Sequence, residues 1–230
     1  MKKGIFAVFK KFLYSNANVY FMNRVIPAIL EQSVGDIQEK LDRIAGLADC
    51  IHLDIGDGVF IPDEIMNDPG VLDLITTEAK IDLHLMIELP EIIIDRWLAP
   101  IVARVTLHIE ATQDMETCIA KVRDAGKQVF LALNPETPLT MIDAYREKVD
   151  GCLIMGVHPG YGGQEFLEQT YDRIRMARAR YATITIAVDG GVKYENAQQI
   201  IESGADQLVM GSGLFDHDTI EEIIQKINAM

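Results

Sequence analysis

Residues 50–55 read Cys-Ile-His-Leu-Asp-Ile, a stretch in which side chains of two kinds alternate. Successive side chains of a β-strand point to opposite faces of a sheet, so His52 and Asp54 share one face while Leu53 and Ile55 share the other. The stretch therefore predicts a strand with an apolar outer face, which helices can cover, and a polar inner face. Such a strand suits the wall of a parallel barrel.

Short β-rich runs of this length recur along the chain, with amphipathic segments between them. The predicted strands are residues 25–30, 50–55, 81–86, 104–109, 128–133, 151–157, 183–188 and 207–210. The predicted helices include residues 33–47, 115–125, 139–148, 164–180, 196–203 and 219–228. Strict alternation of strands and helices implies a parallel sheet, and eight units close it into a (β/α)8 TIM barrel of the α/β class. A doubly wound open sheet is the alternative.

The length of the chain fits one domain. Its 230 residues are 49% apolar, which is enough for a single sizeable core, and no low-complexity linker divides them. We expect one barrel domain over residues 22–230. The first 21 residues carry four lysines and no acid, and we expect them to be a basic extension outside the core. A basic amphipathic helix that docks on a surface is the alternative for this segment.

The overall charge of the chain disfavours polyanionic partners. A net charge of -14 disfavours nucleic acid and anionic membranes, so an anionic substrate needs a local site. No run approaches the 18 or more apolar residues of a membrane span. The three cysteines, Cys50, Cys118 and Cys152, lie far apart in apolar or helical contexts, which favours buried thiols in a reducing compartment. We expect a cytoplasmic protein with a small-molecule partner.

Four polar residues lie at the downstream ends of predicted strands: His52, Asp54, His84 and Asp189. These ends converge at one mouth of a barrel, where active sites of this fold are built. Two imidazoles and two carboxylates suit one divalent ion such as Zn²⁺, Fe²⁺, Mn²⁺ or Co²⁺ better than Ca²⁺. The alternative is that the histidines are hydrogen-bonded structural residues.

Asp54 and Asp189 also suggest acid/base chemistry. Two carboxylates on opposite sides of a barrel can act as a pair, one removing a carbon-bound proton and the other supplying one. A nearby metal that polarises a carbonyl and an adjacent hydroxyl stabilises the enediolate formed on proton loss. Alternatively the two residues are plain ligands, and bound water does the acid/base work.

Three glycine-rich segments follow the sixth, seventh and eighth predicted strands. Glycine lets backbone N–H groups approach an anion closely, and the loops after the last strands of a barrel often bind phosphate. Ordinary tight turns are the alternative. The candidate phosphate-binding residues are Gly160, Tyr161, Gly162, Gly163, Gly190, Gly191, Gly211 and Ser212.

Several longer motifs, read in order, resemble the ribulose-phosphate 3-epimerase family. They are HLDIGDG (52–58), DLHLMIELPE (82–91), LHIEAT (107–112), LALNPETPL (131–139), MGVHPGYGGQEF (155–166), VDGGV (188–192) and GADQLVMGSGLF (204–215). The resemblance runs from about Val25 to the C-terminus. It implies a (β/α)8 barrel of the ribulose-phosphate-binding type.

The resemblance also implies roles for the candidate residues. His52, Asp54, His84 and Asp189 would bind one divalent metal, most simply Zn²⁺ or Fe²⁺, with Asp54 and Asp189 as the catalytic pair. The reaction would be inversion at C3 of a ketose phosphate, by default ribulose 5-phosphate to xylulose 5-phosphate. The substrate would contact His84 and the three glycine loops, while Met86 and Met155 line the pocket. A homo-oligomer is expected on the same ground.

The chain departs from the family pattern around the sugar. Ala28 stands for the usual Ser, Gly56 for Met, Val59 for a polar residue, Asp63 for Asn, and His158 for Asn, Asp or Glu. A Gly in place of Met would enlarge the cavity, which favours a six-carbon ketose such as allulose 6-phosphate as an alternative substrate.

A non-catalytic sugar-phosphate-binding paralogue is a further alternative. Related sugar-phosphate aldolases and decarboxylases place a Lys within the acidic motif, and residues 52–57 contain none.

Overall fold

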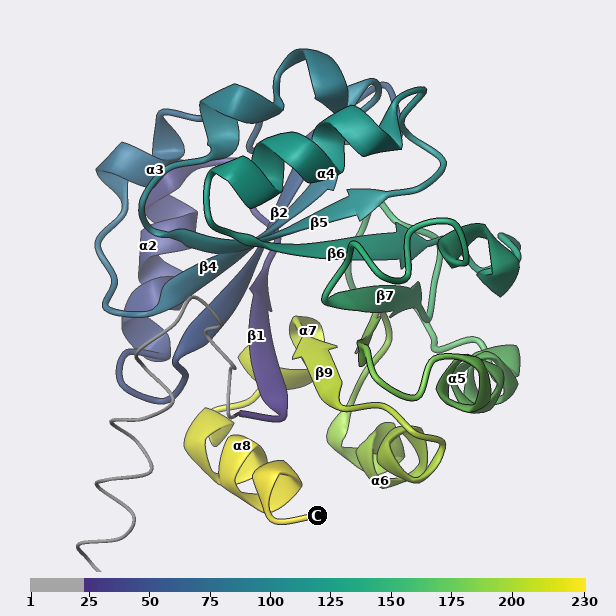
Figure 1. Cartoon of the computed structure of the whole chain (residues 1–230). Coiled ribbons are helices and arrows are strands. Elements are labelled where there is room, and N and C mark those ends of the chain that lie inside the picture. The colour runs from purple at the N-terminus through teal and green to yellow at the C-terminus, as the bar shows by residue number, and fades with distance from the viewer. Residues whose placement is uncertain (1–22) are drawn as a thin grey trace, which may run out of the picture.

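The computed structural model describes residues 23–230, so the predicted extension of residues 1–21 lies outside the described residues and stays a prediction. Parallel strands form a closed ring, and helices cover its outside (Figure 1). The ring runs β1 (Val25–Ile29), β2 (Cys50–Asp57), β4 (Lys80–Met86), β5 (Val102–His108), β6 (Gln128–Leu133), β7 (Gly151–Met155), β8 (Thr185–Asp189) and β9 (Gln207–Met210). β1 pairs in parallel with both β2 and β9, which closes the sheet. The predicted (β/α)8 TIM barrel is confirmed, and the open-sheet alternative is wrong.

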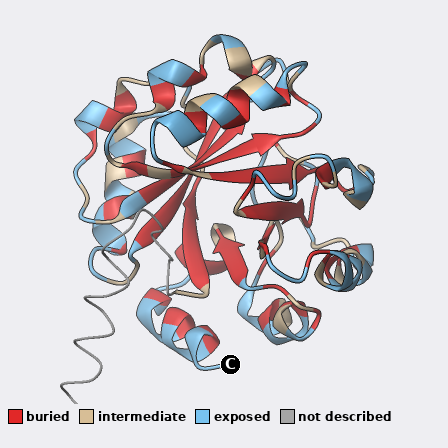
Figure 2. Cartoon of the chain, in the orientation of Figure 1, coloured by how far each residue is buried: buried red, intermediate tan, exposed pale blue. Residues whose placement is uncertain are grey.

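Each outer helix packs an apolar stripe against the barrel (Figure 2). In α2 (Val34–Arg43), for example, Ile37 and Leu41 are buried, and Ser33 caps the helix by accepting a hydrogen bond from the Asp36 N–H at 3.1 Å. The other α-helices are α3 (Val71–Leu74), α4 (Met115–Asp124), α5 (Gln169–Arg180), α6 (Tyr194–Glu202), α7 (Ser212–Phe215) and α8 (Ile220–Asn228). Three 3₁₀ segments are η1 (Pro90–Ile92), η2 (Ile94–Trp97) and η3 (Leu139–Ile142).

The core has two layers because strand side chains alternate. Outward-facing residues such as Leu53 and Ile55 belong to the large cluster between barrel and helices. A second apolar cluster includes inner-face residues such as Phe130 and Met155. Ala28 pairs with His52, and Asp54 with His84, in the register of neighbouring strands. The strand pattern thus directs the polar residues of β2 and β4 into the barrel.

Two predicted helices differ from the structure. Residues 139–148 form only η3 and a series of turns, with short-range bonds from the Tyr145 N–H to Ile142 O at 2.8 Å and from the Lys148 N–H to Tyr145 O at 2.7 Å. Helix α5 begins at Gln169, not at Gln164, because the Gln164 side chain donates to the His158 and Tyr161 carbonyls at 2.7 and 2.9 Å. The residues before α5 are part of the loop that follows β7.

Some features did not stand out in the sequence. A short strand, β3 (Glu64–Ile65), pairs antiparallel with the end of β2, and the short helices α3 and α7 follow it along the chain. The three cysteines are free and buried, which confirms the predicted thiols. Across residues 23–230, none of the helices has the length and apolar character needed to cross a membrane.

Candidate metal and acid/base site

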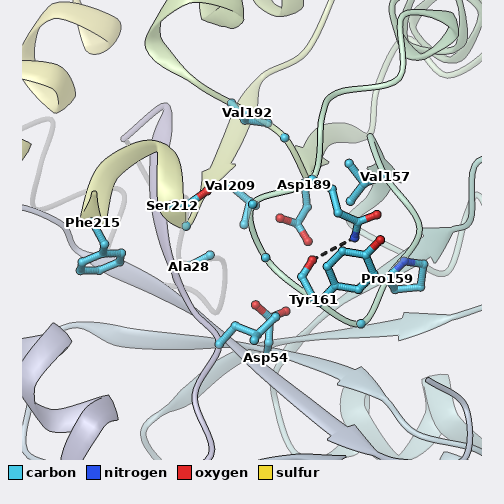
Figure 3. Close-up of a pocket in the computed structure, with 18 of the residues that line it drawn as sticks. Ala28, Asp54, Val157, Pro159, Tyr161, Asp189, Val192, Val209, Ser212 and Phe215 are labelled. Carbon is cyan, nitrogen blue, oxygen red and sulfur yellow. Dashed lines mark hydrogen bonds between the residues drawn. The ribbon is translucent and has the colours of Figure 1, made fainter. Parts of the chain in front are cut away.

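The four predicted ligands lie together at the carboxyl end of the barrel. His52 and Asp54 come from β2, His84 from the neighbouring strand β4, and Asp189 from the last position of β8. One ligand atom from each residue lies within 4.8 Å of all the others. The carboxylates of Asp54 and Asp189 approach each other from different walls of the barrel (Figure 3). The barrel therefore brings together residues that are up to 137 positions apart (189 minus 52).

His52 presents one ring nitrogen to this cluster. Its Nδ1 lies 2.7 Å from Asp82 Oδ2, and the carboxylate accepts the Nδ1–H. Its Nε2 is fully buried and makes no hydrogen bond within residues 23–230, although Asp54 Oδ1 lies 3.4 Å away. A buried imidazole nitrogen without a hydrogen bond is costly unless a cation takes its lone pair. This nitrogen is the observation that fits the cluster to a divalent ion.

His84 is held on both sides. Its Nδ1 lies 2.8 Å from Asp54 Oδ1 and 4.0 Å from Asp189 Oδ2. Its Nε2 lies 2.9 Å from Nε2 of His108, a buried residue of β5 whose Nδ1 is 3.3 Å from Glu110 Oε2. The sequence motifs gave His108 no role. The alternation of side chains along β5 could have indicated it. His108 lies two positions after Thr106, which pairs with His84 in the strand register, so both point to the inner face.

The two carboxylates have opposite electrostatic surroundings. Burial raises the pKa of Asp189 to about 6, and the charge of Asp54 adds to the effect. Burial alone would also raise the pKa of Asp54, but the charge of His52, with the hydrogen bond and charge of His84, outweighs burial and lowers the pKa to about 2. A pair whose pKa values are driven apart is suited to separate acid and base roles.

Burial and neighbouring charges also shift the pKa values of two histidines. Burial would lower the pKa of His52, but Asp82 and Asp54 outweigh it and raise the pKa to about 10. Burial lowers the pKa of His108 to about 4, so its ring is neutral near pH 7. Metal binding requires a neutral His52, so a divalent ion would displace its proton.

A cavity of about 430 Å³ opens above Asp54 and Asp189 (Figure 3). Every candidate phosphate-binding residue of the three glycine loops lines it, namely Gly160, Tyr161, Gly162, Gly163, Gly190, Gly191, Gly211 and Ser212. Ala28, Met86, Met155 and His158 line it as well, whereas His52 and His84 lie buried beneath. Two cations that the motifs did not indicate, Lys40 and Arg43 of α2, also reach the cavity.

The backbone requires glycine at some positions of these loops and not at others. Gly190 and Gly191 adopt positive φ angles of 96° and 67°, and a Cβ on Gly191 would lie 2.6 Å from the Phe166 nitrogen, so the turn itself requires glycine there. Gly162 has no positive φ, and a Cβ on it would meet nothing within 4 Å. The tight-turn explanation therefore accounts for the first two positions and leaves Gly162 without a structural reason.

One expectation about the pocket is wrong. Gly56 does not line the cavity, because a Cβ there would lie 2.5 Å from Cδ1 of Ile61, which is 1% exposed. The buried Ile61 side chain fills the space that a larger residue would occupy, so glycine at this position does not enlarge the cavity.

Of the other four departures, only Ala28 and His158 line the cavity. Val59 is exposed, and His158 Nε2 pairs with Glu136 Oε1 at 2.8 Å in an exposed position at the cavity edge. Asp63 is exposed and does not line the cavity. Ala28 is buried near the carboxyl end of β1 and does line the cavity.

Comparisons with known proteins agree with this geometry. The family model described as "Ribulose-phosphate 3 epimerase family" matches residues 24–215. The chain is 35% identical over 210 residues to ribulose-phosphate 3-epimerase of Buchnera aphidicola, which covers 87% of this chain and 91% of that protein. It is 32% identical over 213 residues to the Escherichia coli (strain K12) protein of the same name, covering 89% and 94%.

Solved structures of lower identity share the fold. The 3-hexulose-6-phosphate synthase of Salmonella typhimurium has a TM-score of 0.66 at 16% identity, and the match covers 90% of this chain and 97% of that one. This likeness concerns the barrel alone. The other comparisons go further, because the family model matches residues 24–215 and the two relatives match nearly the whole barrel at more than 30% identity. The chain therefore belongs to the ribulose-phosphate 3-epimerase family.

Proposed function

We propose that this epimerase inverts C3 of a pentulose 5-phosphate, interconverting D-ribulose 5-phosphate and D-xylulose 5-phosphate, by proton transfer between Asp54 and Asp189. The observation that carries the proposal is the approach of these two carboxylates from different walls of one cavity, with an oxygen of each inside a cluster only 4.8 Å across. The names of the relatives support the substrate pair.

His52, Asp54, His84 and Asp189 would hold one divalent ion, with Zn²⁺ or Fe²⁺ favoured by the two imidazole and two carboxylate donors. The ion supplies Lewis-acid stabilisation of the negative charge that a ketose gains on its oxygens when a C–H proton leaves. The Nε2 of His52, which makes no hydrogen bond among the described residues, supports this assignment independently of the comparisons.

In one direction of the reaction Asp54, with its low pKa, takes the C3 proton, and Asp189, with its raised pKa, delivers a proton to the opposite face of C3. The reverse direction exchanges the two roles. Met86 and Met155, each 2% exposed, give the pocket an apolar wall that limits the access of water to C3.

The phosphate group would lie against backbone N–H groups of the glycine loops, with Gly162 free to approach an anion closely. These loops hold an anion without the help of the overall charge, which is -14. Arg43 at the cavity provides local positive charge where the chain as a whole is acidic, whereas the charge of Lys40 is paired with Glu31 at 2.5 Å.

The test is epimerisation in D₂O with a panel of pentulose and hexulose phosphates and added Zn²⁺ or Fe²⁺. We expect one deuterium at C3 of the product, and the highest kcat/KM with ribulose 5-phosphate. Turnover without deuterium at C3 would exclude proton transfer through exchangeable carboxylates. A higher kcat/KM with a hexulose 6-phosphate would overturn the substrate assignment while leaving the reaction class in place.

A further inference from the structure

A buried polar chain lies on the inner face of the barrel beneath the four-residue cluster, and no step of the proposed reaction uses it. Arg104 of β5 is 1% exposed, and its Nη2 donates to Asp82 Oδ2 at 2.5 Å. Its Nη1 donates to the side-chain oxygen of Gln207 on β9 at 2.7 Å. Asp82 in turn accepts the Nδ1–H of His52 at 2.7 Å. The chain therefore runs Gln207–Arg104–Asp82–His52: it crosses the barrel from β9 to β5 and continues through β4 to a proposed metal ligand on β2.

Stability alone does not account for this chain. A guanidinium and a carboxylate lose most of their hydration on burial, and apolar residues of similar volume often fill such a space at equal or lower cost. Residues of the same inner face, such as Phe130 and Leu153, are in fact apolar, and the Phe130 ring centroid lies 4.1 Å from Arg104 Cζ. A buried charge pair beside such apolar residues points to a role in the site above it.

The hydrogen bonds indicate that role. Asp82 Oδ1 accepts from the Thr106 hydroxyl at 3.0 Å, while Oδ2 receives both Arg104 and His52. A carboxylate beside a permanently charged guanidinium is an acceptor only, so His52 must donate through Nδ1. In the neutral ring that metal binding requires, Nε2 then carries the lone pair, on the side that faces Asp54.

We infer that Arg104 is a positioning residue for His52: it holds the Asp82 carboxylate in the place where that group orients the imidazole with Nε2 toward a bound cation. The inference rests on the proposed metal site. Arg104 also offsets the charge of Asp82, so the two remaining carboxylates, Asp54 and Asp189, match the charge of one divalent ion.

The test measures Co²⁺ binding to metal-stripped, full-length protein by competition with a chromophoric chelator, together with the visible spectrum of bound Co²⁺. Arg104→Met keeps an unbranched stem of four atoms and removes the charge and the hydrogen-bond donors. We expect it to weaken Co²⁺ binding about 10- to 100-fold and to change the spectrum. Arg104→Lys keeps the charge beside Asp82 and should retain most of the affinity.

The matched control is Arg178→Met. Arg178 of α5 pairs with Asp206 on the outside of the barrel, so this variant also loses an Arg–Asp pair but leaves the inner chain intact. Its Co²⁺ affinity and spectrum should equal those of the wild type. Equal effects of the two substitutions would mean that a general loss of stability, and not the positioning of His52, lowers the affinity.

A double-mutant cycle tests whether Arg104 acts through Asp82. Adding Arg104→Met to Asp82→Asn should cause no further loss of Co²⁺ affinity, whereas independent, additive losses would overturn the inference. If Arg104→Met does not fold, Gln207→Leu replaces it, because this variant removes one hydrogen bond of Arg104 without removing a charge. We expect a loss of about threefold for it.

Unchanged Co²⁺ binding in folded Arg104→Met would also overturn the inference, because Arg104 would then have no effect on the site. Tighter binding would overturn it as well, because the charge of Arg104 would then act by repelling the cation. Wild-type binding is measured first, which separates the two proposals. A wild type that binds no Co²⁺ contradicts the metal site itself. A wild type that binds Co²⁺, with an Arg104→Met variant that binds it equally well, contradicts only the role of Arg104.

Discussion

Asp189 differs from Asp54 in its electrostatic surroundings, since burial raises the pKa of Asp189 to about 6 while the neighbouring histidines lower the pKa of Asp54 to about 2. Replacing Asp189 by Asn removes the group that exchanges protons and changes the volume little. We expect Asp189→Asn to lower kcat by about 10²- to 10⁴-fold with an unchanged circular dichroism spectrum.

Asp172→Asn, on the exposed face of α5, is the control for this experiment and should keep wild-type kcat. Near-normal turnover by folded Asp189→Asn would show that a single base or bound water moves the proton.

At Gly56 a comparison of motifs gave the wrong prediction about the pocket. The motif comparison predicted a wider pocket there, but the space is taken by Ile61, which folds back from the loop after β2. Such a contact depends on how a loop packs, and no periodicity in the sequence records it. His108 and Arg104 were missed for a similar reason, because their importance comes from partners on neighbouring strands.

Gly56→Met should therefore destabilise the fold and should not adapt the pocket. A side chain forced against Ile61 costs about 1–3 kcal/mol by overpacking, measurable as a lower denaturation midpoint in urea. Gly35→Ala is the control, since its Cβ would meet only Ser33 Oγ at 3.8 Å. A Gly56→Met protein of wild-type stability would show that Ile61 moves aside readily.

At the scale of elements, the strands were predicted best. Their positions differ from prediction by two residues or fewer at each end, because alternation and β-rich composition are local properties. Helix bounds were poorer. The loop after β7 extends to the start of α5 because Gln164 bonds to carbonyls of that loop, which a helical pattern does not reveal.

The glycine loops lead to a prediction at the same scale. Gly162→Ala adds a methyl group in open space, so the melting temperature should stay constant while KM for the ketose phosphate rises. Gly191→Ala forces a Cβ to within 2.6 Å of the Phe166 nitrogen at a positive φ, so it should lower the melting temperature. An unchanged KM in Gly162→Ala would argue that the phosphate lies elsewhere in the cavity.

For the whole molecule, the four proposed ligands join β2, β4 and β8, so a bound ion would link distant parts of the barrel. A ligand that binds only the native state stabilises it by about 2.7 kcal/mol when the free ligand concentration is a hundred times Kd. We expect the melting temperature to fall when Zn²⁺ is stripped with a chelator and to recover when the ion is returned, as measured by calorimetry.

His52→Ala should abolish this dependence on Zn²⁺. Full epimerase activity after verified removal of all divalent ions would contradict the metal site.

Ring closure has a consequence for how the protein is made. Within residues 23–230, β1 is the first strand along the chain and pairs with β9, the last. The Asn228 side chain of α8 accepts hydrogen bonds from the backbone N–H groups of Arg24 and Val25 at 3.0 and 3.3 Å. A nascent chain still lacking β9 is an unclosed sheet with exposed edges, which other chains can pair with. Closure therefore waits until β9 has been synthesised, and the interval before that is when this barrel is most exposed to aggregation.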